Sequence, residues 1–418
     1  MHETLRLALI SIIISIAIFI CVILFSTIFR RVLHNWKYRR LDRYRDFYRE
    51  KLNDLIDSGK VSHQLNDFIS LPSSTKFQAI EDTLLDLIND DRYKESVKGL
   101  LERLGYIPFY EKRLKSNNNI TRASAIDKLG RMLSETSTNK LVDTFRTKNA
   151  ETISVAVRSL SKIGSTKALK GILEHLPHLL KESLISQKTV EASLTNFGVS
   201  AIPTIIEYGR KNDDTMITAS LLDVLSNLPF TKVSCSFAID HLKNKDAEIR
   251  AKALKVLSQA DISLIDFDQN LLVPLLEDTI WFVRLHAAKA LGNMRYKKAA
   301  DTLGGLLLDE NWQVRDTAAM ALTKFEDDSI DIFLKALKFK DRYAKESICE
   351  EIEKTDFISR LITNLISKDP KTYEKSKEIL HIMYSLNFST PLAEYLKKGG
   401  DDKIKKEIHL ILNKETKT

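Results

Sequence analysis

One stretch of this sequence occurs twice, 31 residues apart, and this repetition limits the possible fold more than any other feature. The first copy begins at Asp278 and reads Asp-x-x-Trp-x-Val-Arg-x-x-Ala-Ala-x-Ala-Leu as far as Leu291. The second copy begins at Asp309 and has the same residue types at the same positions as far as Leu322. A fixed period of about 20–50 residues is typical of arrays in which each unit is one supersecondary element.

Weaker copies of the pattern extend the array on both sides of this pair. They end in apolar helix faces near residues 129, 163, 197, 225, 257, 291, 322, 352, 382 and 412. Second helices are predicted between them at 167–176, 201–210, 233–242, 299–308 and 330–337. Neither helix of a unit buries its apolar side alone, so neighbouring units must stack. We therefore predict an all-α fold, an α-solenoid of helical hairpins over residues 75–418.

The chain contains few residues that break helices, with 13 Gly and 8 Pro among 418 residues. Four of the glycines follow the last apolar residue of a predicted helix: Gly130, Gly164, Gly198 and Gly292. Glycine readily adopts the left-handed conformation that commonly ends a helix. We therefore predict that all four glycines are C-terminal caps.

The frame Asp-x-x-x-x-Val-Arg-x-x-Ala-Ala-x-Ala-Leu-Gly resembles the HEAT repeat family, in the short bacterial form also found in phycobilisome-lyase-type proteins. The resemblance covers about residues 90–412. It implies scaffolding between proteins, and a structural ladder in which Asp278, Arg284, Asp309 and Arg315 bond along the stack. If these pairs are exposed, they contribute about 0–1 kcal/mol each. Membrane-anchored members of the family sometimes accompany enzymes of surface-polysaccharide synthesis, which suggests an envelope setting.

The N-terminal region contains 23 residues without charge, residues 7–29, of which 16 are Leu, Ile, Val or Phe. A helix of this length spans roughly 34 Å, enough for the hydrocarbon core of a bilayer. The alternative is a cleaved signal sequence. However, the apolar run is too long for one, and no small-residue cleavage site follows it. We predict a transmembrane helix over 7–29, preceded by a short extracytoplasmic segment, residues 1–6.

Basic residues gather directly after the apolar segment. Residues 30–51 contain nine Lys or Arg and three Asp or Glu, whereas Arg6 alone precedes the span. Because Lys and Arg stay on the cytoplasmic side, we expect a single-pass protein of the cytoplasmic (inner) membrane, with its N-terminus outside and its bulk in the cytoplasm.

Apolar residues recur at helical spacing after the span, which predicts a basic amphipathic helix over 30–58, followed by a linker over 59–74. This helix either binds anionic lipid headgroups or packs on the first repeat, and both interpretations are compatible. The candidate membrane-surface residues are Arg30, Arg31, Lys37, Arg39, Arg40 and Arg43.

The net charge of +8 lies mostly in this juxtamembrane segment, so the predicted solenoid is close to neutral. A nucleic-acid-binding domain normally carries its own basic surface, so no nucleic acid is expected as a partner. The three cysteines are too far apart in the sequence to form a metal motif, and the usual nucleotide and hydrolase motifs are absent. We expect no cofactor, no metal and no enzymatic activity. The alternative is a HEAT-fold enzyme, either DNA glycosylase-like or lyase-like.

Two tryptophans, Trp281 and Trp312, occupy equivalent positions one repeat apart. Tryptophan and arginine are enriched in binding hot spots. Alternatively, both indole rings pack into the turn between helices. His286 and Lys289 lie off the apolar side of their helix, where they line a groove or are simply solvated. The candidate partner-binding residues are Trp281, Arg284, His286, Lys289, Trp312 and Arg315. The predicted function is a membrane-anchored scaffold that holds a protein partner at the cytoplasmic membrane face.

Overall fold

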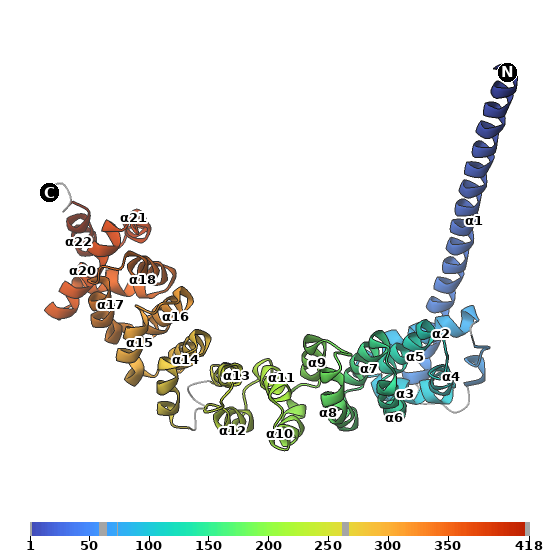
Figure 1. The fold of residues 1–418 in the computed structure, drawn as a ribbon, viewed down its shortest axis with the longest axis horizontal. Coiled ribbons are helices and arrows are strands. Elements are labelled where there is room, and N and C mark those ends of the chain that lie inside the picture. Colours follow the sequence, from blue (N-terminus) through green and yellow to red (C-terminus); the bar gives the residue numbers. More distant parts are fainter. Residues whose placement is uncertain (1, 58–64, 73, 261–266, 414–418) are drawn as a thin grey trace. The chain divides into compact units, whose positions relative to one another are not determined.

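The computed structural model describes residues 2–57, 65–72, 74–260 and 267–413, with side chains from residue 18 onward except those of 33 and 34. The described chain is all-helical, which confirms the predicted fold class (Figure 1). Its helices form two compact units, residues 1–185 and 186–418.

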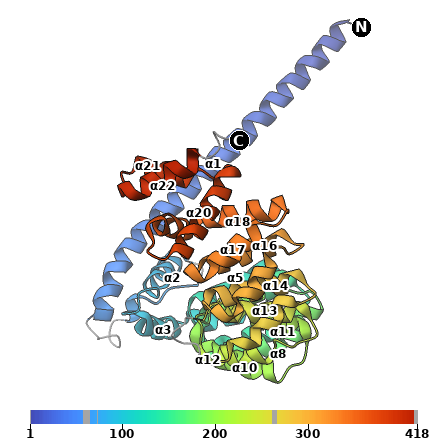
Figure 2. The same cartoon turned by 90° about the vertical axis from the view of Figure 1, so that its left-hand side faces the viewer.

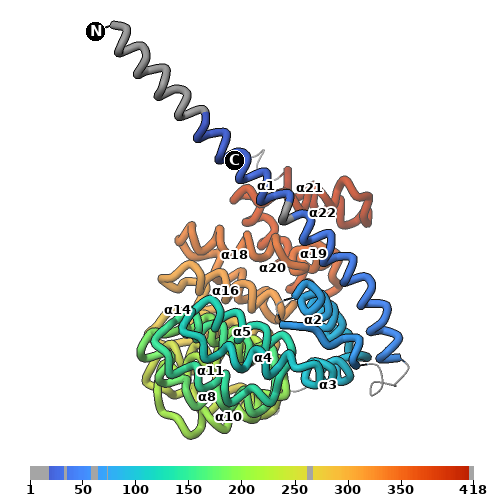
Figure 3. The backbone as a smooth tube through the Cα atoms, turned by 90° about the vertical axis from the view of Figure 1, so that its right-hand side faces the viewer, coloured from blue at the N-terminus to red at the C-terminus, as the bar shows by residue number. Residues whose placement is uncertain are grey.

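The first unit begins with one long helix, α1 (His2–Asp57). Its C-terminal part packs on α2 (Thr75–Leu87), and Leu41, Leu52 and Leu55 are buried there (Figure 3). Between Ile18 and Val32 the large apolar side chains of α1 are exposed. From Ile18 onward α1 is long and apolar enough to cross a membrane, and none of its apolar part is buried.

The segment between α1 and α2, predicted as a linker, packs on α1 where the structure describes it. Residues 58–64 and 73 lie outside the described chain. The 3-10 turn η1 (Leu65–Asp67) precedes Phe68, whose buried ring lies 5.8 Å from the ring of Tyr48. Lys51 on α1 lies 3.8 Å from the Asp67 carboxylate. The foot of α1 is therefore part of the first unit.

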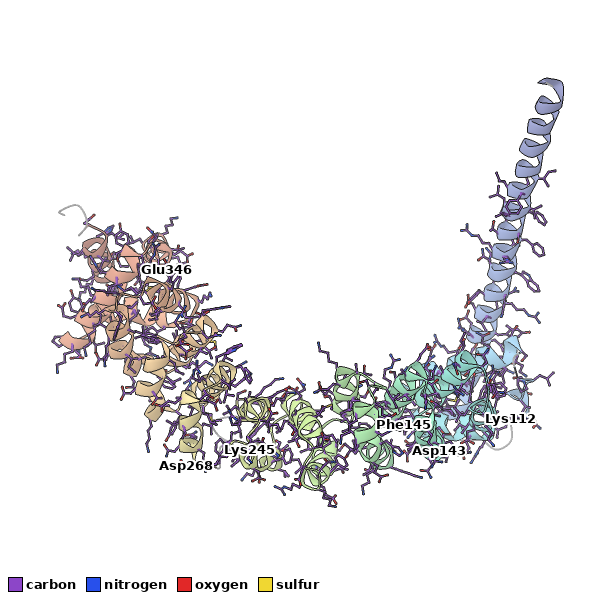
Figure 4. The ribbon with its side chains drawn as sticks, in the orientation of Figure 1. Lys112, Asp143, Phe145, Lys245, Asp268 and Glu346 are labelled. Carbon is purple, nitrogen blue, oxygen red and sulfur yellow. The ribbon has the colours of Figure 1, made fainter. Side chains whose placement is uncertain are left out.

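The remaining helices of the first unit stack in two rows, in which α5 packs on α7 and α6 packs on α8. The buried ring of Phe145 lies 5.5 Å from the ring of His175 on α8 (Figure 4). The helices are α3 (Lys94–Arg103), α4 (Tyr106–Arg113), α5 (Asn119–Arg131), α6 (Thr138–Asp143), α7 (Ala150–Ile163) and α8 (Thr166–Lys181), with 3-10 turns η2 (Glu135–Ser137) and η3 (Thr144–Arg146).

The second unit continues this arrangement. Its helices are α9 (Gln187–Thr195), α10 (Ile202–Arg210), α11 (Thr215–Ser226), α12 (Lys232–Asp240), α13 (Ala247–Leu257), α14 (Trp281–Asn293), α15 (Ala300–Leu306), α16 (Trp312–Thr323), α17 (Ile330–Leu337), α18 (Arg342–Lys354), α19 (Phe357–Thr363), α20 (Pro370–Ser385), α21 (Thr390–Lys397) and α22 (Asp402–Leu412). The 3-10 segments are η4 (Val199–Ala201), η6 (Gln269–Glu277), η7 (Lys297–Ala299), η8 (Glu326–Ser329) and η9 (Asn364–Ile366). In the first row, α9, α11, α13, α14, α16 and α18 follow one another (Figures 1 and 2). In the second row, α10 packs on α12, and α15 lies between η6 and α17.

The repeats keep one register through the first row. Val283 of α14, Val314 of α16 and Ala344 of α18 are all buried, and the residues four, five and eight positions after each are buried as well. Each predicted second helix overlaps a helix of the structure, namely α8, α10, α12, α15 and α17. Opposite α14, the corresponding segment is the 3-10 helix η6, which contains Pro274.

The glycine prediction is confirmed at Gly164, holds only for the sign of φ at Gly198, and is wrong at the other two positions. Gly164 caps α7 in the left-handed conformation with a φ of 69°, whereas Gly198 has a φ of 70° but a ψ of −164°, and Asn196 caps α9. Gly130 and Gly292 lie inside α5 and α14 instead. A Cβ atom on Gly292 would lie 2.5 Å from the Cβ of Ala321 on α16, and one on Gly130 would lie 2.5 Å from the Cβ of Ser159 on α7. These glycines are needed for close helix packing.

Candidate partner-binding site

The two tryptophans follow matching turns at the start of α14 and α16. Asp278 Oδ1 accepts a hydrogen bond of 2.9 Å from the Ile280 N–H, and Asp309 Oδ1 accepts one of 2.9 Å from the Asn311 N–H. Trp281 is the first residue of α14 and is 39% exposed. Trp312, the first residue of α16, is 60% exposed. The turn therefore presents both indole rings to solvent at one edge of the first row.

Beneath these rings, arginine–aspartate pairs join one repeat to the next. Arg284 Nε and Nη2 donate to Asp309 Oδ2 and Oδ1 at 2.7 and 2.9 Å. Arg250 makes the same bidentate contact with Asp278, at 2.8 and 2.9 Å. It also donates 3.0 Å to the carbonyl oxygen of Lys245, in the turn before α13 (Figure 4). The arginines thus bond along the stack, as the resemblance implied.

The assumption that these pairs are exposed is wrong. The side chain of Arg284 is 16% exposed and that of Asp309 is 6% exposed. The hydrogen bonds that Arg284 donates to Asp309 raise the pKa of Arg284 above its ordinary value. Burial alone would raise the pKa of Asp278, but the hydrogen bonds from Arg250 and the Ile280 N–H outweigh burial and lower it. An energy of about 0–1 kcal/mol, typical of exposed pairs, therefore does not apply to them.

The ladder ends at Arg315. Its Nη1 donates 2.8 Å to the Asp309 carbonyl oxygen, as Arg284 Nη1 does to the Asp278 carbonyl oxygen. Its Nε is enclosed and has no hydrogen-bond partner among the described residues.

His286 and Lys289 lie farther along α14 than Trp281. Lys289 is exposed, whereas His286 is partly buried and its Nδ1 has no partner among the described residues. Burial, followed by the positive charges of Lys289 and Lys255, lowers the pKa of His286. The six candidate residues therefore form two groups. Trp281, Arg284, Trp312 and Arg315 lie near the starts of α14 and α16, and His286 and Lys289 lie farther along α14.

A cleft of about 650 Å³ near the C-terminal ends of α14 and α16 contains basic residues that the sequence pattern did not single out. Arg295 and Lys324 line it together with the acidic residues Glu326 and Asp356. Burial, then the charges of Lys289 and Arg295, lower the pKa of Lys324, whose Nζ donates 2.6 Å to Asn293 Oδ1. Neither cation belongs to the repeated frame, so the repeat pattern does not predict this cleft.

The six candidate membrane-surface residues, Arg30, Arg31, Lys37, Arg39, Arg40 and Arg43, are all exposed on α1. None forms an ion pair with a carboxylate of the described chain. Arg45 and Arg49, farther along the helix, instead form ion pairs with Asp82 and Asp86 of α2. Pairing of the basic residues with carboxylates therefore begins where α1 packs against α2.

A comparison with protein families finds a match to HEAT repeats over part of the chain. Two overlapping matches place HEAT repeats at residues 235–322 and 269–353. These HEAT repeats contain both exposed tryptophans and the whole ladder from Arg250 to Arg315.

Solved structures similar to this chain include an engineered protein with 19% identity, which covers 83% of this chain and 98% of its own, at a TM-score of 0.34. Kap121p has 12% identity, covers 83% of this chain and 48% of its own, and has a TM-score of 0.47. Kap121p bound to Pho4p has 14% identity, the same coverage and a TM-score of 0.45. The chain thus spans about half the length of Kap121p. No curated protein matches the sequence.

Proposed function

We propose that this chain is a single-pass membrane protein whose HEAT repeats hold a protein partner at the cytoplasmic membrane face. The observation that carries the proposal is the apolar part of α1, which no other described segment covers. An uncovered helix of this composition gains several kcal/mol by entering a bilayer, at about 0.4 kcal/mol for each large aliphatic residue. α1 continues without a break into the first unit, so the membrane would hold that unit directly.

The basic residues of α1 support both the orientation and a contact with lipid. The six exposed cations from Arg30 to Arg43 follow the apolar part directly and lack carboxylate partners in the described chain. Cations near an anionic membrane surface contribute about 1 kcal/mol each. We propose that they hold the start of the cytoplasmic region against lipid headgroups, with the N-terminus on the outer side.

The edge of the HEAT repeats supports the choice of a protein as the partner. Trp281 and Trp312 combine large apolar area with an N–H donor, and both rings are open to solvent. The buried pair Arg284–Asp309 fixes the turn between them. We propose that the two rings, with Arg315 beside them, form the main contact and that His286 and Lys289 extend it. We do not advance the glycosylase-like or lyase-like alternatives, because no observation on the described residues favours them.

Cysteine labelling tests the anchor. Cys21 is exposed on α1, whereas Cys235 and Cys349 are buried in the second unit. In vesicles, the hydrocarbon core should protect Cys21 from maleimide, and the control variant Glu50→Cys should be labelled. In intact cells, a membrane-impermeant maleimide should label Glu3→Cys and leave Glu50→Cys unlabelled. Labelling of Cys21 in vesicles would refute the anchor, and the opposite pattern in cells would refute the orientation.

Photo-cross-linking in intact membranes tests the partner surface. A photoreactive residue in place of Trp281 or Trp312 should capture one and the same protein. The matched control is a photoreactive residue in place of Ile120, which is exposed on α5 of the first unit. Capture of that protein from position 120, or of none from positions 281 and 312, would show that this edge is not the contact.

A further inference from the structure

The register of the HEAT repeats shows that one ladder position has lost its acid. The buried positions of α16 and α18 are 30 residues apart, as Val314 and Ala344 illustrate. The position in α18 that corresponds to Asp309 is therefore Phe339. In the two preceding steps, the arginine binds the aspartate of the next repeat. At the third step, Arg315 faces the position of a phenylalanine.

The guanidinium of Arg315 is held in place but only partly satisfied. The bond from Nη1 to the Asp309 carbonyl oxygen, 2.8 Å long, orients it as Arg284 is oriented one repeat earlier. Nε is enclosed without an acceptor among the described residues. Nε and Nη2 are the two donors that bind the carboxylate in Arg284. Because Nε is enclosed, the donor of Arg315 left for a carboxylate from outside is Nη2, which forms no hydrogen bond within the described chain.

A mostly apolar notch lies between α15 and α17, next to the turn that contains Asp309. Its volume is about 220 Å³, and it is lined by Asp301, Gly304, Gly305, Leu308, Ile332, Lys335, Ala336 and Phe339. Leu308 directly precedes Asp309, to which Arg315 is bonded, and Phe339 is 47% exposed. A Cβ atom added to Gly305 would meet nothing within 4 Å, so this wall of the notch is open. The notch has room for one aliphatic side chain.

The charge around the notch favours an acidic ligand. Residues 335–345 contain five Lys or Arg and one Asp. That aspartate, Asp341, accepts from the Ala344 N–H as the cap of α18. Lys338 and Arg342 pair with Glu378 and Glu346, and Asp301 lines the notch, so the free positive charge is that of the remaining three lysines. Lys335 and Lys340 are exposed and form no ion pair with a described carboxylate.

We propose that this edge binds a peptide segment of the protein partner in which an acidic residue lies beside an aliphatic one. The carboxylate accepts from Nη2 of Arg315, and the aliphatic side chain enters the notch beside Gly305. Trp312, 60% exposed on the same turn, covers the peptide. The inference rests on the proposed scaffold function and specifies the chemistry of the partner.

Peptide binding to the full chain in detergent micelles tests the proposal. The probes are fluorescein-labelled nonapeptides with one central Asp and one Leu at varied spacing, and the same peptides with Asn in place of Asp. By fluorescence anisotropy, the best Asp peptides should bind about tenfold to hundredfold more tightly than their Asn counterparts, as expected of a hydrogen bond to a charged group. Equal affinities would overturn the proposal.

Three variants separate the parts of the site. Phe339→Asp supplies the missing carboxylate within the chain and should abolish the preference for Asp, whereas the matched variant Phe339→Asn should keep it. Arg315→Gln should also abolish the preference for Asp over Asn. Gly305→Val should weaken the binding of the Asp and Asn peptides alike, because the added side chain fills the notch. Gly99→Val, at an equally open site on α3, should leave the binding of both peptides unchanged. A preference for Asp that survives in both Phe339→Asp and Arg315→Gln would overturn the assignment.

The two proposals can fail separately. If cross-linking from position 312 captures a partner equally well in Phe339→Asp, the scaffold function stands and the acidic segment does not. If no partner is captured but wild-type protein still prefers Asp peptides through Arg315, the site stands and the scaffold function does not.

Discussion

The ladder arginines show how one side chain connects three parts of a repeat array. Arg284 belongs to α14, donates to the Asp278 carbonyl oxygen in its own turn at 2.8 Å and binds the Asp309 carboxylate of the next turn. Asp309 in turn fixes its own turn through the Asn311 N–H. Because both charged groups are mostly buried, removal of one leaves the other without compensation.

We therefore expect Arg284→Met or Asp309→Leu to lower the free energy of unfolding by about 3–5 kcal/mol each, as for other buried pairs. The double variant should lose less than the sum, because it leaves no unpaired charge. Urea unfolding followed by circular dichroism measures both effects. The control is Arg342→Ala, which removes an exposed pair with Glu346 and should leave the free energy of unfolding nearly unchanged. Strictly additive losses would refute the coupling.

His286 makes stability depend on pH. Its pKa is lowered in the folded protein by burial and by Lys289 and Lys255, and the carboxylate of Asp223 opposes this effect. The unfolded chain, with a histidine pKa of about 6.5, therefore binds the proton first as the pH falls. The stability contributed by neutral His286 is present above that value and is lost below it. Wild type should lose more stability than His286→Gln between pH 8 and 5.5 in denaturant titrations, and parallel curves would contradict this.

The sequence predicted which residues belong to the candidate site better than it predicted their exposure and contacts. Trp281 and Trp312 could be singled out because they repeat, but their exposure depends on the Asx turns at Asp278 and Asp309. Phe339 could not be recognised as a ladder position, because the α18 repeat keeps only the pattern of buried residues and not the Asp, Trp or Arg.

At the scale of elements, the distance between neighbouring helices depends on small residues. The helix pairs and most of their ends follow from apolar periodicity, since that pattern is the one each helix must bury. Gly130 and Gly292 looked like caps because each follows an apolar residue near a helix end. Their close contacts with Ser159 and Ala321 lie on the next repeat and depend on the stacking distance, which one helix does not encode.

We expect Gly292→Ala to destabilise the protein by about 1–3 kcal/mol, although alanine favours helices over glycine, because the added methyl group overlaps Ala321. Gly305→Ala, on α15 of the same unit, meets nothing within 4 Å and should instead stabilise by about 0.5–1 kcal/mol. Thermal unfolding of the two variants beside wild type measures the difference. Equal shifts in Tm would rule out the packing explanation.

At the scale of the whole molecule, the basic residues of α1 fall into two sets. Arg45 and Arg49 hold α1 on α2, whereas the set from Arg30 to Arg43 has no such partners in the described chain. Composition predicted the basic segment as a whole. It did not predict this division, because the contacts of Arg45 and Arg49 depend on how α2 returns to α1.

We expect that replacing Arg30, Arg31, Lys37, Arg39, Arg40 and Arg43 with Gln will leave the first unit folded and will produce a mixed orientation in the membrane. The physical reason is that orientation follows the Lys and Arg balance close to the span. In cells, the impermeant maleimide should then label both Glu3→Cys and Glu50→Cys in part. A single orientation retained by the variant would mean that other features set the topology.

The unbroken course of α1 also has a mechanical consequence. No loop separates the apolar part of α1 from its buried residues Leu41, Leu52 and Leu55. In a membrane, α1 would therefore fix both the distance of the first unit from the bilayer and the direction in which this unit faces. One alanine inserted between Trp36 and Leu41 would rotate that unit by about 100° and raise it by about 1.5 Å. Four alanines would add about one full turn and restore the direction in which the first unit faces.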